Sequence, residues 1–236
     1  MVAKTEEAGL RGSHDFAPGI GSFGWKLGVF RTDSSDDILA IPVPNLQGFG
    51  YYQNIGSTRR QGIEAEANLK SRSFEIYANY ALVDARFRDA LSLGSNSPSA
   101  DPATGTIQVE PGDQIPAIPR HRLKAGIDYL VTDKLKLGGD MLLVSSQYFV
   151  GDASNQQPKL PGYAVFNLHG SYDISKTIQL YARVDNVFDN HYSTYGTFFD
   201  TQALPNFTNA GAAFADARSV SPARPRAFYA GMKVTF

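Results

Sequence analysis

The final stretch of the chain, RAFYAGMKVTF at residues 226–236, alternates between two kinds of side chain. Polar or small residues such as Lys233 and Thr235 separate the apolar ones. The apolar positions are Phe228, Ala230, Met232, Val234 and Phe236. Because successive side chains of a β-strand point to opposite faces, this pattern predicts a strand with one apolar and one polar face.

The same two-residue period recurs in eight further segments. In residues 178–185, for example, Leu180 and Val184 fall on one face and Arg183 and Asp185 on the other. The runs are about ten residues or longer, whereas strands of soluble sheets are mostly about five or six. A tilted strand that crosses a membrane needs roughly nine to eleven residues. The predicted strands are residues 5–14, 22–33, 58–71, 73–87, 120–131, 135–149, 162–173, 177–188 and 225–236.

The connections between these segments alternate in length. Tight turns are expected at residues 16–22, 70–73, 131–134 and 173–177. Long connections rich in Gly, Pro, Asn, Ser and Asp are expected at residues 34–57, 88–119, 150–161 and 189–224. Short turns at one end and long loops at the other are typical of outer-membrane β-barrels, in which the short turns are periplasmic. The sequence therefore predicts an all-β, antiparallel portion of a transmembrane barrel with about nine meandering strands.

Composition excludes several classes of protein. The formal net charge of −1 leaves no basic surface of the kind that nucleic acids require, so nucleic acid is not expected as a partner. The chain has no Cys, and it is rich in Phe, Tyr and Gly. No apolar run approaches the roughly 20 residues of a spanning helix, and residues 1–12 lack the apolar core of a secretory signal.

A soluble protein is the alternative at this point. A self-contained β-sandwich or lipocalin-like barrel that binds an apolar ligand inside would show the same alternation of side chains. Strand length and the alternation of short and long connections favour the membrane reading. In that reading a register slip of one residue would turn Lys233 towards lipid, at a cost of about 2 to 4 kcal/mol near the bilayer midplane.

Seven segments resemble the C-terminal barrel region of TonB-dependent outer-membrane receptors, in the order that this family shows. They cover nearly the whole chain. The segments are NIGSTRRQGIEAEANL, YANYALVDARF, IPAIPRHRLKAGIDYL, SSQYFVGD, LPGYAVFNLHGSYDI, VDNVFDNHYST and SPARPRAFYAGMKVTF.

The resemblance implies a barrel of roughly 22 strands that is occluded by an N-terminal plug. Such receptors lie in the outer membrane of Gram-negative bacteria, contact its lipid, and import scarce ligands such as ferric siderophores with energy delivered through TonB. The terminal strand resembles the signal that the β-barrel assembly machinery reads. Its apolar residues are Phe228, Met232, Val234 and Phe236.

Against this family pattern, residues 1–236 are expected to form a single, partial barrel domain without plug, signal peptide or TonB box. An open sheet in hydrocarbon leaves edge N–H and C=O groups unpaired, each at a cost of several kcal/mol. We therefore expect a fragment that does not transport alone, with TonB reached only through a plug that is missing. An exposed edge is predicted along residues 225–236.

Catalytic residues, metals and cofactors are not expected. The four histidines, His14, His121, His169 and His191, lie on separate segments without metal-ligand spacing. Asp36 and Asp37 are expected in a solvated loop, and the NFT sequon at residues 206–208 has little meaning in a bacterial outer membrane. Arg183 and Asp185 are expected to join a network of charges across strands.

Aromatic side chains gather where a predicted strand meets the last long loop. We interpret them either as an interfacial girdle or, in an intact receptor, as part of a ligand-binding vestibule, and the girdle is the favoured interpretation. The four residues are Tyr192, Tyr195, Phe198 and Phe199.

Overall fold

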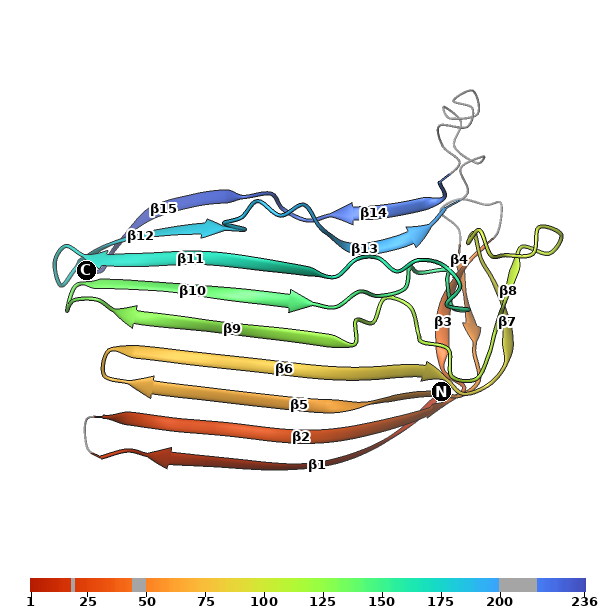
Figure 1. The fold of residues 1–236 in the computed structure, drawn as a ribbon, viewed down its shortest axis with the longest axis horizontal. Helices are drawn as coiled ribbons and strands as arrows, with labels where there is room; N and C mark the ends of the chain where they lie inside the picture. Colours follow the sequence, from red (N-terminus) through yellow and green to blue (C-terminus); the bar gives the residue numbers. More distant parts are fainter. Residues whose placement is uncertain (18–19, 44–49, 200–215) are drawn as a thin grey trace, which may run out of the picture.

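The computed structural model describes residues 1–17, 20–43, 50–199 and 216–236, and these ranges contain strands but no helix. Nine strands form one antiparallel sheet in which each strand pairs with the next along the chain (Figure 1). They are β1 (Val2–Asp15), β2 (Gly21–Ser35), β5 (Thr58–Ser71), β6 (Phe74–Phe87), β9 (His121–Leu130), β10 (Leu135–Val144), β11 (Tyr163–Asp173), β12 (Ile178–Asp185) and β15 (Ala227–Val234). The predicted meander of nine strands is confirmed.

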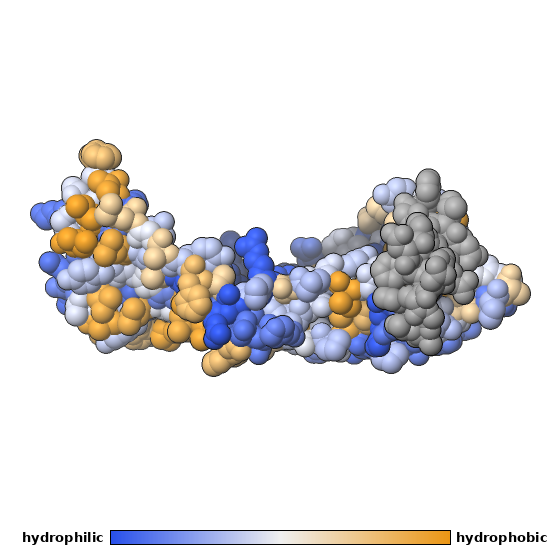
Figure 2. Space-filling view, turned by 90° about the horizontal axis from the view of Figure 1, so that it is seen from above, coloured by the Kyte–Doolittle hydropathy of each residue, from blue (hydrophilic) through white to orange (hydrophobic). Residues whose placement is uncertain are grey.

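The sheet is open. Within the described ranges, β1 pairs only with β2 and β15 pairs only with β12, so the edge predicted along residues 225–236 is confirmed. Seen from the β15 side, the molecule is a thin, curved layer, with hydrophobic residues gathered near one end (Figure 2). No helix in the described part has the length and hydrophobicity needed to cross a membrane.

Two predicted strands are too long at their C-terminal ends. The segment expected to reach residue 149 leaves the sheet after Val144, and Gln147 bonds instead to Leu160 in the loop that follows. The segment expected to reach residue 188 ends at Asp185, because Asn186 has a φ of 52°. A residue in this left-handed region cannot continue an extended strand.

Strand register sorts the side chains into two faces. Directly opposed partners share a face, and one such row runs from Phe228 through Val184 to Leu168. We call this the apolar face, and it also carries Trp25 and Leu27. The opposite, polar face carries Lys26, Glu66, Lys124, Asp128, Arg183 and Lys233. The predicted division of each strand into two faces is confirmed.

The two ends of the sheet also differ, as predicted. Tight turns connect the strands at the short-turn end, where the Thr132 hydroxyl accepts the Leu135 N–H at 3.0 Å and the Ser175 hydroxyl accepts the Ile178 N–H at 3.1 Å. Such hydroxyl groups stabilise a turn by replacing missing ladder partners. At the opposite, long-loop end, three additional hairpins extend from the sheet (Figure 1).

The sequence did not predict these hairpins inside the long connections. They pair β3 (Ile38–Pro42) with β4 (Gly50–Asn54), β7 (Leu91–Gly94) with β8 (Thr106–Val109), and β13 (Ser193–Phe198) with β14 (Arg218–Pro222). Each is short, and short hairpins are stable only when they pack on something else.

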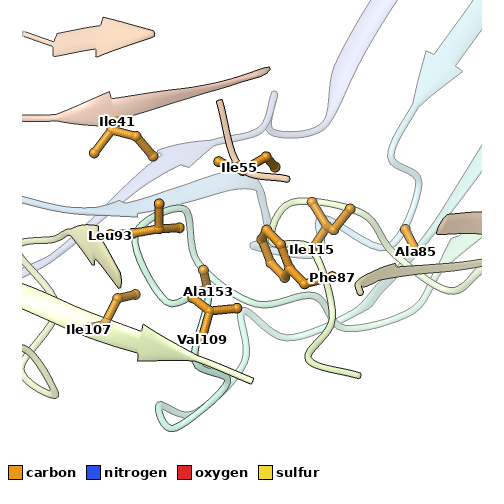
Figure 3. Close-up of a cluster of buried hydrophobic side chains, with 9 residues drawn as sticks. All are labelled: Ile41, Ile55, Ala85, Phe87, Leu93, Ile107, Val109, Ile115 and Ala153. Atoms are coloured by element: carbon orange, nitrogen blue, oxygen red, sulfur yellow. The ribbon is translucent and has the colours of Figure 1, made fainter. Parts of the chain in front are cut away.

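A compact hydrophobic core provides that support at the long-loop end (Figure 3). Phe87, at the end of β6, is fully buried among side chains from the first two hairpins and from the loops around them. The cluster contains Ile41, Ile55, Ala85, Phe87, Leu93, Ile107, Val109, Ile115 and Ala153. Burial is therefore concentrated in the loop assembly, while the apolar face of the sheet is exposed, with Leu10 at 70% and Phe228 at 72%.

Candidate functional site

A network of hydrogen bonds lies on the polar face of β9, β10 and β11. Asp128, Gly138 and His169 are direct neighbours across these three strands. His169 Nε2 lies 2.9 Å from Asp128 Oδ1, and Lys136 Nζ lies 3.3 Å from the same oxygen. A Cβ at position 138 would lie 2.4 Å from His169 Nε2. Glycine at this position therefore allows the two side chains to meet across the middle strand.

The network continues towards the long-loop end. Asn167 Nδ2 donates to Asp140 Oδ2 at 2.7 Å, and Asn167 Oδ1 accepts the backbone N–H of Asn186 at 2.9 Å. Arg183 Nε donates to Asp185, two residues along the same strand. The prediction of a network across strands is wrong for this pair, because residues i and i+2 of a strand share a face and here they meet directly.

A hollow of about 660 Å³ lies beside this network, on the polar face of β1, β2, β5, β6 and β9. Four cationic side chains face two carboxylates around it, and Lys26 Nζ pairs with Glu66 at 3.0 Å. The charged residues are Arg11, Lys26, Glu64, Glu66, Arg122 and Lys124. Within the described residues, Arg11, Arg122 and Lys124 have no ion-pair partner, and Lys124 Nζ lies 5.8 Å from the centre of the Tyr77 ring. The hollow is thus cationic and open to an anion.

Asp37 lies at the long-loop end of the first strands and is 5% exposed, so the expected solvated loop is wrong for this residue. Its carboxylate accepts bonds from Thr58 Oγ1 at 2.6 Å, Arg60 Nη1 at 3.0 Å and the Ile38 N–H at 2.9 Å. Burial opposes ionisation, but these donors outweigh it and hold the pKa of Asp37 below its ordinary value. The neighbouring Asp36 is exposed, as expected.

A second buried carboxylate, Asp152, lies in the loop between β10 and β11 and is 0% exposed. It accepts the backbone N–H groups of Gln156 and Gln157, each at 3.0 Å. Burial raises the pKa of Asp152 above its ordinary value despite these two bonds. The sequence did not single out this residue, since one Asp in a polar loop carries no distinguishing pattern.

The four predicted aromatic residues do not converge on one site. Tyr192 stacks on Tyr163, with 4.4 Å between ring centres, and Tyr163 belongs to the polar face of β11. Tyr195 is exposed, whereas Phe198 is 4% exposed and packs against Phe149 with ring centres 5.2 Å apart. The half-buried Phe199 bonds through its N–H to the carbonyl of Ala217. Tyr192 thus lies against a residue of the polar face, whereas a girdle residue would lie over the apolar face.

The histidines lie apart from one another. His14 packs edge-on against Phe16, His121 Nδ1 lies 2.8 Å from the Tyr80 hydroxyl, and His191 is exposed. Among the residues that the structure describes, no three His, Asp or Glu side chains converge as metal ligands would. The NFT sequon at residues 206–208 lies outside the described residues.

The residues expected to form an assembly signal lie at the open edge. Phe228, Met232 and Val234 lie on the apolar face of β15 and are 72%, 60% and 40% exposed. Phe236 follows the strand and is fully exposed. All four are accessible in this sheet.

Comparison with known proteins assigns this architecture to a family. The family model described as "TonB dependent receptor-like, beta-barrel" matches residues 1–187. A probable TonB-dependent siderophore receptor of Acinetobacter baumannii, PiuA, is 24% identical over 179 residues, which cover 74% of this chain and 22% of that receptor. The ferric enterobactin receptor of Pseudomonas aeruginosa is 32% identical over 111 residues, which cover 44% of this chain and 14% of the receptor.

Solved structures show the same fold. The crystal structure of PiuA matches with a TM-score of 0.69 and 18% identity over 98% of this chain and 28% of that one. The ferric yersiniabactin uptake receptor FyuA of Yersinia pestis matches with a TM-score of 0.67 and 17% identity over 99% of this chain and 30% of that one. The chain thus spans less than a third of the length of these relatives. It belongs to the TonB-dependent receptor family, and its nine-stranded sheet is part of the outer-membrane β-barrel of that family.

Proposed function

We propose that this chain forms part of the wall of a receptor that imports a scarce, anionic ligand such as a ferric siderophore. The observation that carries the proposal is the cationic hollow on the polar face, opposite an apolar face suited to lipid. The names of two relatives, a siderophore receptor and a ferric enterobactin receptor, support this class of ligand. The alternative of a soluble protein that binds an apolar ligand is not favoured, because the exposed face of the sheet is apolar and the hollow is charged.

The hollow is suited to anions for a physical reason. Arg122 and Lys124 alternate with Leu123 on β9, so both cations point to the polar face. Neither is neutralised by a carboxylate in the described residues, and the low-dielectric wall strengthens their field. An anionic ferric complex would gain from both charges, and Glu64 and Glu66 would repel it less strongly than the four basic residues together attract it.

The long-loop end beyond β11 and β12 supplies aromatic contacts in this proposal. Tyr195 is exposed and Tyr192 is half-buried, and tyrosine offers both a flat apolar ring and a hydroxyl group to a ligand. Phe198 acts differently, because its burial against Phe149 holds the β13 hairpin in place. Phe199 anchors the same hairpin through its backbone. We infer no catalytic role for any of these residues.

We infer that import requires more of the barrel than these nine strands. The outer edges of β1 and β15 carry N–H and C=O groups without ladder partners in the described part, and such groups are costly in hydrocarbon. Further strands that pair with both edges would remove this cost. TonB and the β-barrel assembly machinery are the partners that the family implies, and Phe228, Met232, Val234 and Phe236 are the residues that the machinery would contact.

Ligand titration of the full chain tests the proposal. The chain is refolded in detergent micelles and titrated with ferric enterobactin, and binding is followed by the visible absorbance of the iron complex. We expect R122Q/K124Q to weaken binding by about tenfold, equivalent to roughly 1.4 kcal/mol, because two unpaired charges are removed. K134Q, which removes one charge in the short turn between β9 and β10, is expected to bind as the unmodified chain does.

Equal binding by R122Q/K124Q and the unmodified chain would exclude the hollow as the ligand site. The membrane assignment has a separate test, which is expression of the chain without detergent. We expect aggregation through the exposed apolar face, and a monodisperse soluble monomer would contradict the proposal.

A further inference from the structure

The apolar face changes character where β1, β2, β5 and β6 approach the long-loop end. Its last apolar row consists of Ala8, Val29, Ile63 and Leu82, which are direct cross-strand neighbours. The next two rows on the same face are almost entirely charged. They consist of Glu6, Arg31, Gln61 and Asp84, followed by Lys4, Asp33, Arg59 and Arg86, and we call these eight residues the charged grid.

Carboxylates within the grid hold the arginines by one nitrogen only. Arg31 Nε and Arg59 Nε donate to the two oxygens of Asp33 at 2.8 and 2.6 Å, and Arg86 Nε donates to Asp84 at 2.8 Å. Arg86 Nη1 also donates to the Gly112 carbonyl at 2.7 Å. In the described residues, the terminal amino groups of Arg31 and Arg59 make no hydrogen bond. The N–H groups of these terminal amino groups therefore lack an acceptor within the described residues, while the bonds through Nε hold the guanidinium groups in place.

Two of these arginines are direct neighbours. Arg59 on β5 lies opposite Arg86 on β6, and like charges in directly opposed positions of a sheet destabilise it. Arg120 adds a further cation, since its Nη2 lies 3.5 Å from Asp84 Oδ1. Together with Arg120 the grid holds five basic and three acidic side chains. An anion between Arg59 and Arg86 would compensate the excess charge.

The position of the grid indicates which anion is available. It continues the apolar face, directly above the last apolar row, and it lies at the long-loop end of the sheet, which is the extracellular end in outer-membrane barrels. The headgroup zone of the membrane begins where the apolar belt ends. On the opposite flank the same face carries the apolar residues Met141, Leu143 and Phe166 at its upper end. A phosphate accepts several N–H donors at once, and arginine matches its geometry.

We propose that the charged grid binds phosphate groups of lipids in the outer leaflet, with Arg59 and Arg86 holding one phosphate between them. The two carboxylates Asp33 and Asp84 set the orientation of the guanidinium groups. The site anchors one flank of the sheet to the headgroup layer, and it lies on the face opposite the ligand hollow.

A lipid titration of the refolded full chain tests this site. The probes are bisphosphorylated lipid A and the same lipid after enzymatic removal of its phosphates, each in detergent micelles. R59Q/R86Q is expected to weaken binding of bisphosphorylated lipid A by about tenfold, whereas the dephosphorylated lipid binds both proteins equally weakly. The matched control R72Q/K134Q removes two charges at the short-turn end and is expected to bind lipid A as the unmodified chain does.

Other outcomes would overturn the proposal. They are undiminished binding by R59Q/R86Q, equal affinity for the two forms of lipid A, or displacement of lipid A by an equimolar amount of inorganic phosphate, which would indicate a site for free anions. Folding of each variant is checked by hydrogen exchange of the sheet amides. If R59Q/R86Q does not fold, K4Q/R31Q serves in its place, because both side chains are well exposed, and a result without weakening overturns the proposal equally.

Discussion

Strands β2, β5 and β6, each 14 or 15 residues long, continue past the apolar belt at the long-loop end, whereas β12 and β15 stop after 8 residues. The long strands have support on both faces there, from the charged grid on one side and the core around Phe87 on the other. The short strands end at side-chain hydrogen bonds, with Asn186 at the centre. Tertiary packing thus covers the extended ends of β5 and β6, whereas local polar groups lie where β12 and β15 end.

Disrupting the core beside the long strands β2, β5 and β6 should have the largest effect on stability. Phe87→Ala leaves a cavity among the residues of Figure 3, and we expect a loss of about 3 to 5 kcal/mol in the local stability of the loop assembly. Hydrogen exchange should accelerate in residues 88–119 but not around residue 186. Phe228→Ala is the matched control, because Phe228 is 72% exposed on the apolar face. Equal acceleration in both variants would show that the loop core is not independent.

The stability of the region where the short strands β12 and β15 end should depend on Asn186. We expect a slightly smaller effect there than that of Phe87→Ala. Its side chain accepts the Asn190 N–H at 2.9 Å and donates to the carbonyls of Asn190 and Arg224 at 2.9 and 3.3 Å. Asn186→Ala should cost about 2 to 4 kcal/mol, because three hydrogen bonds of a buried side chain are lost and alanine disfavours a φ of 52°. The readout is hydrogen exchange of residues 186–192. Asn186→Gly should recover about 1 kcal/mol by relieving the backbone, and identical values for the two variants would argue against backbone strain.

The two buried carboxylates, Asp37 and Asp152, should affect stability with opposite dependences on pH. The pKa of Asp37 is lowered, so its contribution to stability is present above its unfolded value of about 3.9 and is lost as the pH falls through the lowered pKa. The pKa of Asp152 is raised, so its contribution is present below about 3.9 and is lost as the pH rises through the raised pKa. Local opening, measured by hydrogen exchange corrected for the intrinsic effect of pH, should show both trends.

Substitutions separate these two contributions. Asp37→Asn should cost about 1 to 3 kcal/mol at neutral pH by weakening the bonds to Thr58 and Arg60. Asp36→Asn is its control, because Asp36 is exposed, and asparagine accepts the positive φ at this position. Asp152→Asn should flatten the pH trend of residues 150–160 alone. A pH trend of the same sign at both sites would refute the assignment.

The smallest effect is expected at the exposed pair of Asp216 and Arg218, next to β14. The guanidinium of Arg218 lowers the pKa of the Asp216 carboxyl to about 2, but both groups are accessible to water. Solvent screens such a pair, so Asp216→Asn should leave hydrogen exchange of β14 unchanged. A marked acceleration would show that the third hairpin relies on this contact.

Much of the fold could be predicted from the sequence because a strand of the barrel alternates strictly. The two faces of β12 and β15 and the tight turn at Thr132 follow from local patterns, whereas the open edge along β15 was expected from the resemblance to a longer barrel. The candidate site was less predictable. Phe198 and Tyr192 occur in one aromatic run, yet one is buried against Phe149 and the other stacks on Tyr163, since their partners lie far away along the chain.

The sequence by itself determined the nine strands of the main sheet, the face on which each of their side chains lies, and the alternation of tight turns with long connections. These features depend on neighbours one or two residues apart. Only the tertiary structure decided which residues oppose one another, and this juxtaposition places Arg59 beside Arg86, His169 beside Asp128 and Thr58 beside Asp37. Cross-strand register and loop packing join residues that are distant in the chain. The cationic hollow, the charged grid and the core around Phe87 therefore arise only when the sheet is assembled.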